Sequence, residues 1–426
     1  MSEKKTKASG IVQKDETMLI EESINEIINQ AVNRGASDIH LEPREGFLLI
    51  RFRIDGRLRE ANRLPKIFEV LLIEHIKHIA GLKLSERRLP QLGSFDKKLK
   101  SDNYSFKVSS LPTVDGEKIV IKLLKENGEF NNFRDLGVWG DNLKVIENSI
   151  LKNKGLIIIG GPASSGKSSL VNIILNNLST PTVNISSLEK VVQIKLKGVN
   201  QIELGSSHTL SFANSLKSLH DQDTNIIYIE EITDLDTLEI ALELASAGKL
   251  LILSLNGNSL NELLSKLDNL GINKQVLANE TLVLSCQKLI RKLCLNCRVE
   301  YQPNNLIINK VLKDIGLSES HFSQIHGLEN EAIHEGLGKD LKDNSSDKKT
   351  INRLFKAGEE GCKDCNYTGY KGRTGVFDVL DISKNKDKLI NLNAKNSKKV
   401  INYLLIDGLI KVLRGITSLE EVFQVI

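Results

Sequence analysis

Near the middle of the chain, residues 161–169 have the types and spacing of a loop that binds phosphate groups. The stretch Gly161 to Ser168 matches G-x-x-x-x-G-K-S/T without a gap, after an apolar run and before a helical pattern. Glycines let the backbone curl so that its N–H groups point at phosphate oxygens. Lys167 would reach the β- and γ-phosphates, and the Ser168 hydroxyl would ligate Mg²⁺. The sequence therefore predicts that ATP and Mg²⁺ are bound by Gly161, Pro162, Ala163, Ser164, Ser165, Gly166, Lys167, Ser168 and Ser169.

A second apolar run, NIIYIEE, ends in the acidic pair Glu230 and Glu231. Ligands of parallel sheets sit at the carboxyl ends of the strands, so these carboxylates are placed to serve the same site. One of them would orient an attacking water or hold the magnesium shell. The alternative is a pair of solvated glutamates at the end of a strand.

Four of the five cysteines form two Cys-x-x-Cys pairs, CLNC and CKDC. Paired knuckles of this spacing place four thiolates around one metal, and soft thiolate ligands favour zinc in a tetrahedral site. The alternatives are unrelated thiols or a redox pair. We expect Zn²⁺ to be held by Cys294, Cys297, Cys362 and Cys365, whereas Cys286 lies in an apolar stretch and is expected to be a core residue.

The elements that must position these residues follow from the pattern of the second half of the chain. Four strand-like runs, GLIIIGG, TVNISS, NIIYIEE and LLILSL, are separated by helical segments. This rhythm is typical of an α/β fold with a parallel sheet and crossover helices. The segment 304–360, between the two cysteine pairs, is polar and reads as an excursion from the zinc knuckles, and the tail after Asp378 is helical.

The first part of the chain has a different pattern. Residues 1–17 are predicted to be a disordered tail, and residues 18–34 a helix that ends at Gly35. The next stretch alternates like strands and is broken by a hairpin signal at Asp55-Gly56, before a helix over 67–81 and two more strands. The sequence thus predicts an α+β module over 18–124 and a polar linker over 125–135.

Composition limits what the chain can be. At 426 residues it needs two or three domains, and its apolar runs are too short to span a bilayer. The net charge of +4 comes from mixed acidic and basic residues, which argues against a nucleic-acid partner. The N-terminus has no apolar signal-peptide core, so we expect a cytoplasmic protein.

Several further stretches accompany these motifs in a fixed order. They are GASDIHLEP, RFRIDGRLRE, SERRLPQLG, SSLPTVDGEKIVIKLL, LSFANSLKSLHDQDTNIIYIEEITDLDTLEIA, QKLIRKLCLNC and GCKDCNYTGYKGRTGVFDVL. With them, the chain resembles the secretion ATPases of type II secretion and type IV pilus assembly, over residues 18–380. The tetracysteine motif points to the assembly branch of that family.

The resemblance implies an architecture and partners. A PAS-like module over 18–124 would precede a RecA-like P-loop ATPase domain over 136–426, which includes a zinc-knuckle subdomain over 286–378. The family implies a homo-hexameric ring that powers pseudopilus or pilus assembly at the cytoplasmic face of the inner membrane, through a membrane platform protein. Family members commonly carry another N-terminal domain, and here only residues 1–17 precede the module.

Departures from the family pattern bear on hydrolysis. In the acidic box, Glu189 remains, but Lys190 and Gln193 stand where the family has Asp and Glu. In the histidine box, Lys249 and Asn256 replace two histidines. Each lost electrostatic or acid–base group typically costs about 10²-fold in rate, without additivity.

Catalytic side chains that the family pattern retains are Glu231, Glu189, Arg51 and Arg53, together with Arg87 and Arg88. The module's arginines would reach the γ-phosphate of a bound nucleotide, although Ser94 and Lys107 replace two others. Three hypotheses follow. The first is a hexameric motor with weakened ATPase activity, and the second is a nucleotide-binding structural or regulatory subunit, alone or in a mixed ring with an intact paralogue. The third and less favoured hypothesis is a DNA-transfer ATPase.

Overall fold

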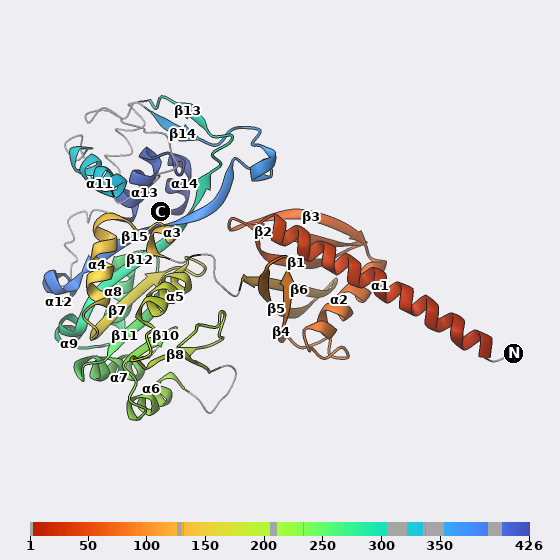
Figure 1. The fold of residues 1–426 in the computed structure, drawn as a ribbon, viewed down its shortest axis with the longest axis horizontal. Helices are drawn as coiled ribbons and strands as arrows, with labels where there is room; N and C mark the ends of the chain where they lie inside the picture. The colour runs from red at the N-terminus through yellow and green to blue at the C-terminus, as the bar shows by residue number, and fades with distance from the viewer. Residues whose placement is uncertain are drawn as a thin grey trace. The chain divides into compact units, whose positions relative to one another are not determined.

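The computed structural model describes residues 3–125, 130, 132–204, 211–232, 234–304, 322–334, 337, 353–390 and 403–426. The chain folds into two compact units, residues 1–129 and residues 130–426, each with its own sheet (Figure 1).

The first unit is a six-stranded antiparallel sheet with two helices. The strand order is β3-β2-β1-β6-β5-β4. The strands are β1 (Ala36–Arg44), β2 (Phe47–Ile54), β3 (Arg57–Pro65), β4 (Gln91–Leu99), β5 (Asp102–Thr113) and β6 (Gly116–Lys125), and the helices are α1 (Glu3–Asn33) and α2 (Ile67–Ile79).

Alternation along the strands explains this sheet. In β2, Leu48, Ile50 and Phe52 are buried, while the residues between them are partly exposed. The buried set packs with α1 and α2 into one core. The β2–β3 hairpin turns at Asp55 and Gly56, which both adopt positive φ (49° and 83°), as the sequence predicts for a tight Asp-Gly turn.

Helix α1 begins earlier than the sequence pattern predicts. It starts at Glu3, so residues 3–17 are helical in the structure, where a disordered tail was predicted. The stretch contains Glu, Lys and Ala, which favour helix, and no proline, and it continues into the packed part of α1. The helix ends where expected, before Gly35 (φ 66°).

The second unit is built on a seven-stranded sheet of order β15-β12-β7-β11-β10-β8-β9. Its strands are β7 (Gly155–Gly161), β8 (Ile185–Glu189), β9 (Asn200–Glu203), β10 (Ile226–Ile229), β11 (Leu250–Asn256), β12 (Thr281–Leu293) and β15 (Tyr370–Asp381). Every neighbouring pair is parallel except β12 and β15, which are antiparallel. The predicted α/β fold with a parallel sheet is confirmed.

Helices cover both faces of this sheet. They are α3 (Phe133–Leu136), α4 (Gly140–Ile150), α5 (Lys167–Leu178), α6 (Phe212–Asp221), α7 (Leu235–Ser246), α8 (Leu260–Asn269), α9 (Lys274–Glu280), α11 (Phe322–His334), α12 (Lys386–Ile390), α13 (Tyr403–Leu413) and α14 (Leu419–Val425). Short 3-10 turns span Lys363–Cys365 and Ile382–Lys384, and a small ribbon pairs β13 (Val299–Tyr301) with β14 (Leu354–Lys356).

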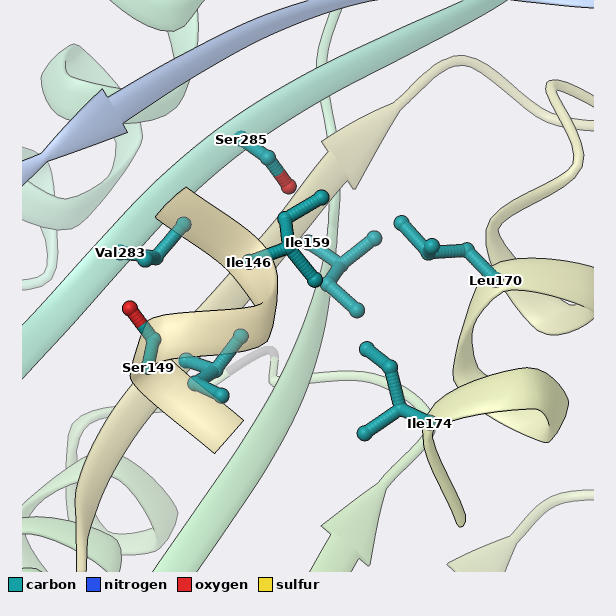
Figure 2. Close-up of a pocket in the computed structure, with 8 residues that line it drawn as sticks. Ile146, Ser149, Ile159, Leu170, Ile174, Val283 and Ser285 are labelled. Carbon is teal, nitrogen blue, oxygen red and sulfur yellow. The ribbon is translucent and has the colours of Figure 1, made fainter. Parts of the chain in front are cut away.

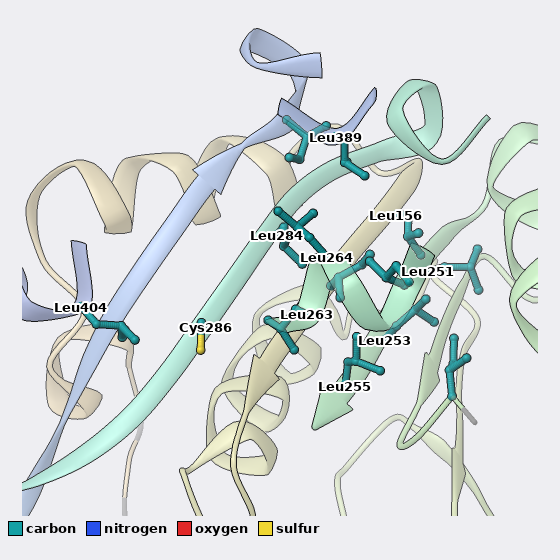
Figure 3. Packing of buried hydrophobic residues seen from close by; sticks show 14 of the residues in the cluster. Leu156, Leu251, Leu253, Leu255, Leu263, Leu264, Leu284, Cys286, Leu389 and Leu404 are labelled. Atoms are coloured by element: carbon teal, nitrogen blue, oxygen red, sulfur yellow. The ribbon is translucent and has the colours of Figure 1, made fainter. Parts of the chain in front are cut away.

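The central strands are buried on both sides, and this explains their continuous apolar runs. Ile157 and Ile159 of β7 pack with α4 and α5 in one core. Leu156 and Ile158 face the opposite core with the helices that follow β10 and β11. Figure 3 shows leucines of β11 and α8 in this second core, with Cys286 of β12 among them. Cys286 is fully buried, as predicted for a core residue, and burial raises its pKa to about 12.

Two boundaries differ from the sequence-based ones. Residues 286–293 and 370–378, expected in a zinc-knuckle subdomain, are parts of β12 and β15 and therefore belong to the main sheet. Helix α3 begins inside the segment 125–135 that was predicted to be a linker. Much of the predicted excursion over 304–360 lies outside the described residues, and its described part contains α11 and β14.

A small cavity between α4, β7, α5 and β12 is a packing defect rather than a site. Its volume is about 10 Å³, enough for at most one water, and its lining is mainly Ile, Leu and Val side chains (Figure 2). None of the described helices is long and apolar enough to cross a membrane.

Candidate functional site

The predicted phosphate loop connects the end of β7 to the start of α5. Its backbone requires glycine at two positions: Gly161 has φ 154° and Gly166 has φ 91°. A Cβ on Gly161 would lie 2.4 Å from Ser165 Oγ and 2.5 Å from the carbonyl oxygen of Gln287. The helix that follows aims its N-terminus at the loop, an arrangement that favours anions. Ser168 is exposed in its first turn.

Lys167 is held against the loop by three hydrogen bonds. Its Nζ donates to the carbonyl oxygens of Gly161 (2.7 Å) and Pro162 (2.9 Å) and to Asn256 Oδ1 (3.0 Å). Burial lowers the pKa of Lys167, while the nearby Cys286 and Glu231 oppose this shift. A phosphate oxygen that accepts from Lys167 would replace one or more of these partners.

A chain of polar side chains joins Lys167 to the acidic pair. Asn256 ends β11 directly opposite Gly161, which explains why its side chain reaches the loop. Asn256 Nδ2 donates to Glu231 Oε1 at 3.0 Å. The other carboxylate oxygen of Glu231 accepts from Lys190 Nζ in an ion pair. Glu231 therefore has both oxygens engaged, one by each neighbour.

The remaining acidic candidates make different contacts. Glu230 accepts a hydrogen bond from the backbone N–H of Lys190 at 2.5 Å, and burial raises its pKa although this bond opposes the shift. Glu189 accepts from Ser187 Oγ (2.6 Å) and Gln201 Nε2 (3.0 Å), on β8 and β9. The structure thus links Glu231, rather than Glu189, to Lys167 of the loop, through the side chain of Asn256.

Arg51 and Arg53 lie on β2 of the first unit. Arg51 forms an ion pair with Glu42 at 2.7 Å, and Arg53 lies 3.6 Å from Asp38 and donates to the Gly56 carbonyl at 2.9 Å. Glu42 is buried; burial would raise its pKa, but hydrogen bonds from Arg51 and Lys118 outweigh this and lower it. Both arginines are thus oriented by carboxylates on the neighbouring strand β1.

The four cysteines of the two knuckles meet at one point. The antiparallel pairing of β12 and β15 brings together Cys294 and Cys297, which follow β12, and Cys362 and Cys365, which precede β15. Sulfur–sulfur distances are 3.7 Å (Cys294–Cys362), 3.7 Å (Cys297–Cys365) and 3.8 Å (Cys362–Cys365), and all four sulfurs lie within 4.8 Å. A tetrahedral ion with 2.3 Å bonds to sulfur requires about 3.8 Å between ligands. The donor set and its geometry therefore fit zinc.

Backbone groups around Cys365, one of the four cysteines, favour the thiolate form that a metal needs. The N–H groups of Cys362 and Gly369 donate to Cys365 Sγ at 3.3 and 3.2 Å. Burial opposes ionisation of Cys365, but these hydrogen bonds outweigh it and lower the pKa to about 6. Sulfur distances near 3.7 Å are far longer than a disulfide bond.

Two features of the site were not found from sequence. Asn256 was noted only as a replacement, although its position at the carboxyl end of a strand would have pointed to the site. Gln287, within the apolar run of β12, lies directly beneath the loop. By contrast, Lys249 directly precedes β11 and so lies at the amino ends of the parallel strands, whereas the loop lies at their carboxyl ends. Lys249 donates to the Thr224 carbonyl at 2.6 Å, and its side chain does not face the loop.

The chain was compared with known families and proteins. A family model described as "Type II/IV secretion system protein" matches residues 13–424. The type IV pilus assembly ATPase PilB of Pseudomonas aeruginosa is 31% identical, with 100% of this chain and 70% of that protein aligned. The type II secretion system protein E of Dickeya dadantii is 32% identical, with 94% and 74% aligned.

Two further matches show the extent of the likeness. PilB of Thermus thermophilus is 32% identical over 409 residues, and the match spans 42% of that protein's length. Among solved structures, the ATPase DotB of Legionella pneumophila aligns over 94% of both chains with a TM-score of 0.61 at 15% identity, which supports the fold.

Proposed function

Because the chain belongs to the type II/IV secretion system protein family, we propose that it is an ATP-binding subunit that powers type IV pilus or type II pseudopilus assembly. The observation that carries this proposal is the convergence of Lys167 and Glu231 on Asn256, each through a 3.0 Å hydrogen bond. The loop lysine and a carboxylate that follows a neighbouring strand both lie at the carboxyl ends of the parallel strands. Ligands of such sheets bind there.

Each residue of the site has a proposed role toward ATP. The loop from Gly161 to Ser169 binds the phosphates through its backbone N–H groups and Lys167. Ser168, exposed at the start of α5, is placed to hold Mg²⁺, which would neutralise phosphate charge. Glu231 would orient the attacking water. Glu189, at the carboxyl end of β8, would add negative charge on the same side of the sheet.

The assembly proposed for this chain is a homo-hexameric ring at the cytoplasmic face of the inner membrane, bound to a membrane platform protein. In such a ring, we propose that Arg51 and Arg53 act on the bound nucleotide. The carboxylates that orient them, Glu42 and Asp38, support a fixed arginine geometry. A guanidinium fork held in this way suits phosphate recognition.

A second candidate function is a nucleotide-binding subunit with negligible turnover. The ion pair between Lys190 and Glu231 favours it, because an attacking water must compete for a carboxylate whose two oxygens already accept hydrogen bonds. Lys190 stands where the resembled family has an acidic residue, so its positive charge also disfavours a magnesium ion nearby. A mixed ring with an intact paralogue would suit such a subunit.

One pair of assays on the purified full chain tests both candidates: fluorescent-ATP binding and steady-state phosphate release. Lys167→Ala should weaken ATP binding by at least about 100-fold, because a charge-assisted contact is lost. Lys249→Ala, a lysine at the amino ends of the strands, is the matched control and should bind normally. Glu231→Gln should keep ATP affinity within about twofold and remove any hydrolysis.

Unchanged ATP binding by Lys167→Ala would refute the assignment of the loop. Phosphate release that Glu231→Gln abolishes supports the motor. Tight ATP binding without phosphate release supports the second candidate.

A further inference from the structure

Side chains of β12 lie beneath the phosphate loop, and that of Gln287 is nearer to Gly166 than that of Leu289. The Gln287 side chain is fully buried. Its Nε2 lies 2.6 Å from where a Cβ on Gly166 would be, and its backbone oxygen lies 2.5 Å from the corresponding point on Gly161. The side-chain amide of Gln287 therefore lies against Gly166, and the backbone of the same residue lies against Gly161; these are the two glycines that shape the loop. Strand β12 pairs directly with β7, which fixes this position.

The Gln287 amide is unsatisfied. Within the described part of the chain, neither its Nε2 nor its Oε1 has a hydrogen-bond partner. Ser165 of the loop is 3% exposed, and its Oγ also has no partner among the described residues. An unpaired buried amide destabilises a fold, because its hydration is lost and nothing replaces it. A Leu or Met of similar volume would fill the same space without that penalty.

The hydrogen bonds of Lys167 indicate when partners would become available. In this structure, Lys167 donates hydrogen bonds to the carbonyl oxygens of Gly161 and Pro162. When a phosphate accepts from Lys167 instead, those carbonyls lose their donor, and the loop backbone is free to reorient. Gln287 offers an N–H₂ donor and a C=O acceptor on the other side of the same loop.

We propose that Gln287 is a positioning residue that hydrogen-bonds the phosphate loop, with Ser165, when the loop binds the polyphosphate of a nucleoside triphosphate. Satisfying this buried amide then contributes to ATP affinity, and its unpaired state weakens the nucleotide-free protein. This inference rests on the proposed function of the loop. It assigns to the residue a stability effect and an affinity effect of opposite sign.

The test is Gln287→Leu in the full chain, with Gln287→Met as a second variant. Thermal melting without nucleotide should shift to a higher temperature, because an unpaired amide is removed from the core. The Kd for a non-hydrolysable ATP analogue with Mg²⁺ should rise about tenfold, as expected for the loss of one or two hydrogen bonds. A residue that only fills the core would not move these two quantities in opposite directions.

Thr281→Val is the matched control. Thr281 is on the same strand, is buried, and its hydroxyl has no partner among the described residues, but it lies at the far end of β12 from the loop. It should raise the melting temperature and leave ATP affinity unchanged.

Three outcomes would overturn the inference. Unchanged affinity in Gln287→Leu and Gln287→Met, while the unmodified chain binds ATP, would refute it and leave the proposed function standing. A fall in both stability and affinity would show that the amide is already paired without nucleotide. If the unmodified chain fails to bind the analogue, the proposed function fails, and this inference fails with it.

Discussion

At the residue scale, the Glu231 carboxylate is the group on which we propose that hydrolysis depends. Lys190 and Asn256 hold its two oxygens, and Lys190 is exposed enough to move. An exposed ion pair contributes little to stability, so replacing Lys190 should leave the fold intact. Gln193 lies in the loop between β8 and β9, and its side chain cannot take a proton.

Restoring carboxylates at these two positions should therefore raise turnover. In Lys190→Asp with Gln193→Glu, Glu231 is released from its cation and an acid–base group is returned. We expect phosphate release to increase at least about tenfold, roughly 1.4 kcal/mol of barrier. Adding Glu231→Gln to the same variant should remove the gain. A smaller gain would favour the second candidate, a nucleotide-binding subunit with negligible turnover. Fast hydrolysis by the unmodified chain would contradict the proposal that its site is impaired.

At the scale of elements, the pairing of β12 with β15 holds the tetracysteine cluster together. Each strand delivers one Cys-x-x-Cys pair to the same end of the sheet. Arg291 also fixes the path of the chain from Leu293 to this cluster. Its buried side chain forms an ion pair with Glu421 of α14 and lies over the Tyr370 ring. The knuckles are therefore attached to the sheet on which the phosphate loop is built.

Purified protein should contain about one zinc ion per chain by elemental analysis. Cys362→Ser should lose the metal and lower the melting temperature, because metal binding at such clusters is coupled to folding. Cys286→Ser is the control: its sulfur is in the core beside Leu263, away from the cluster, so zinc content should not change (Figure 3). Freshly purified protein without metal would disprove the zinc assignment.

At the scale of the whole molecule, the first unit has a core of its own. Among the residues that the structure describes, the buried apolar side chains of this core lie between Ile24 and Ile121. The buried Lys77 is also satisfied within the unit, by Glu117 (2.9 Å) and the Glu86 carbonyl (2.6 Å). A closed core and satisfied buried charges are what independent folding requires.

A fragment of residues 18–124 should therefore fold alone. We expect a cooperative thermal transition and dispersed amide resonances. The control is the same fragment with Phe52→Ala, which removes a fully buried side chain and should lower stability by about 3–5 kcal/mol. A fragment that gives an unfolded spectrum would show that the module depends on the rest of the chain.

Features that depend on near neighbours in the chain are predictable from the sequence. Gly161 to Ser168, the Asp55-Gly56 turn and the four apolar runs are each recognisable within a short window, because backbone freedom and side-chain alternation act between near neighbours. The fold class followed from the order of these segments, and the two cysteine pairs followed from their spacing.

Contacts between residues that are distant in the chain depend on how the strands are ordered in the folded sheet. Strand order places β11 and β12 on either side of β7, and this brings Asn256 and Gln287 to the phosphate loop. Lys249, seven residues before Asn256, lies instead at the amino end of β11, away from the loop. Hydrogen-bond partners across a parallel sheet depend on register and strand order, which local patterns do not encode.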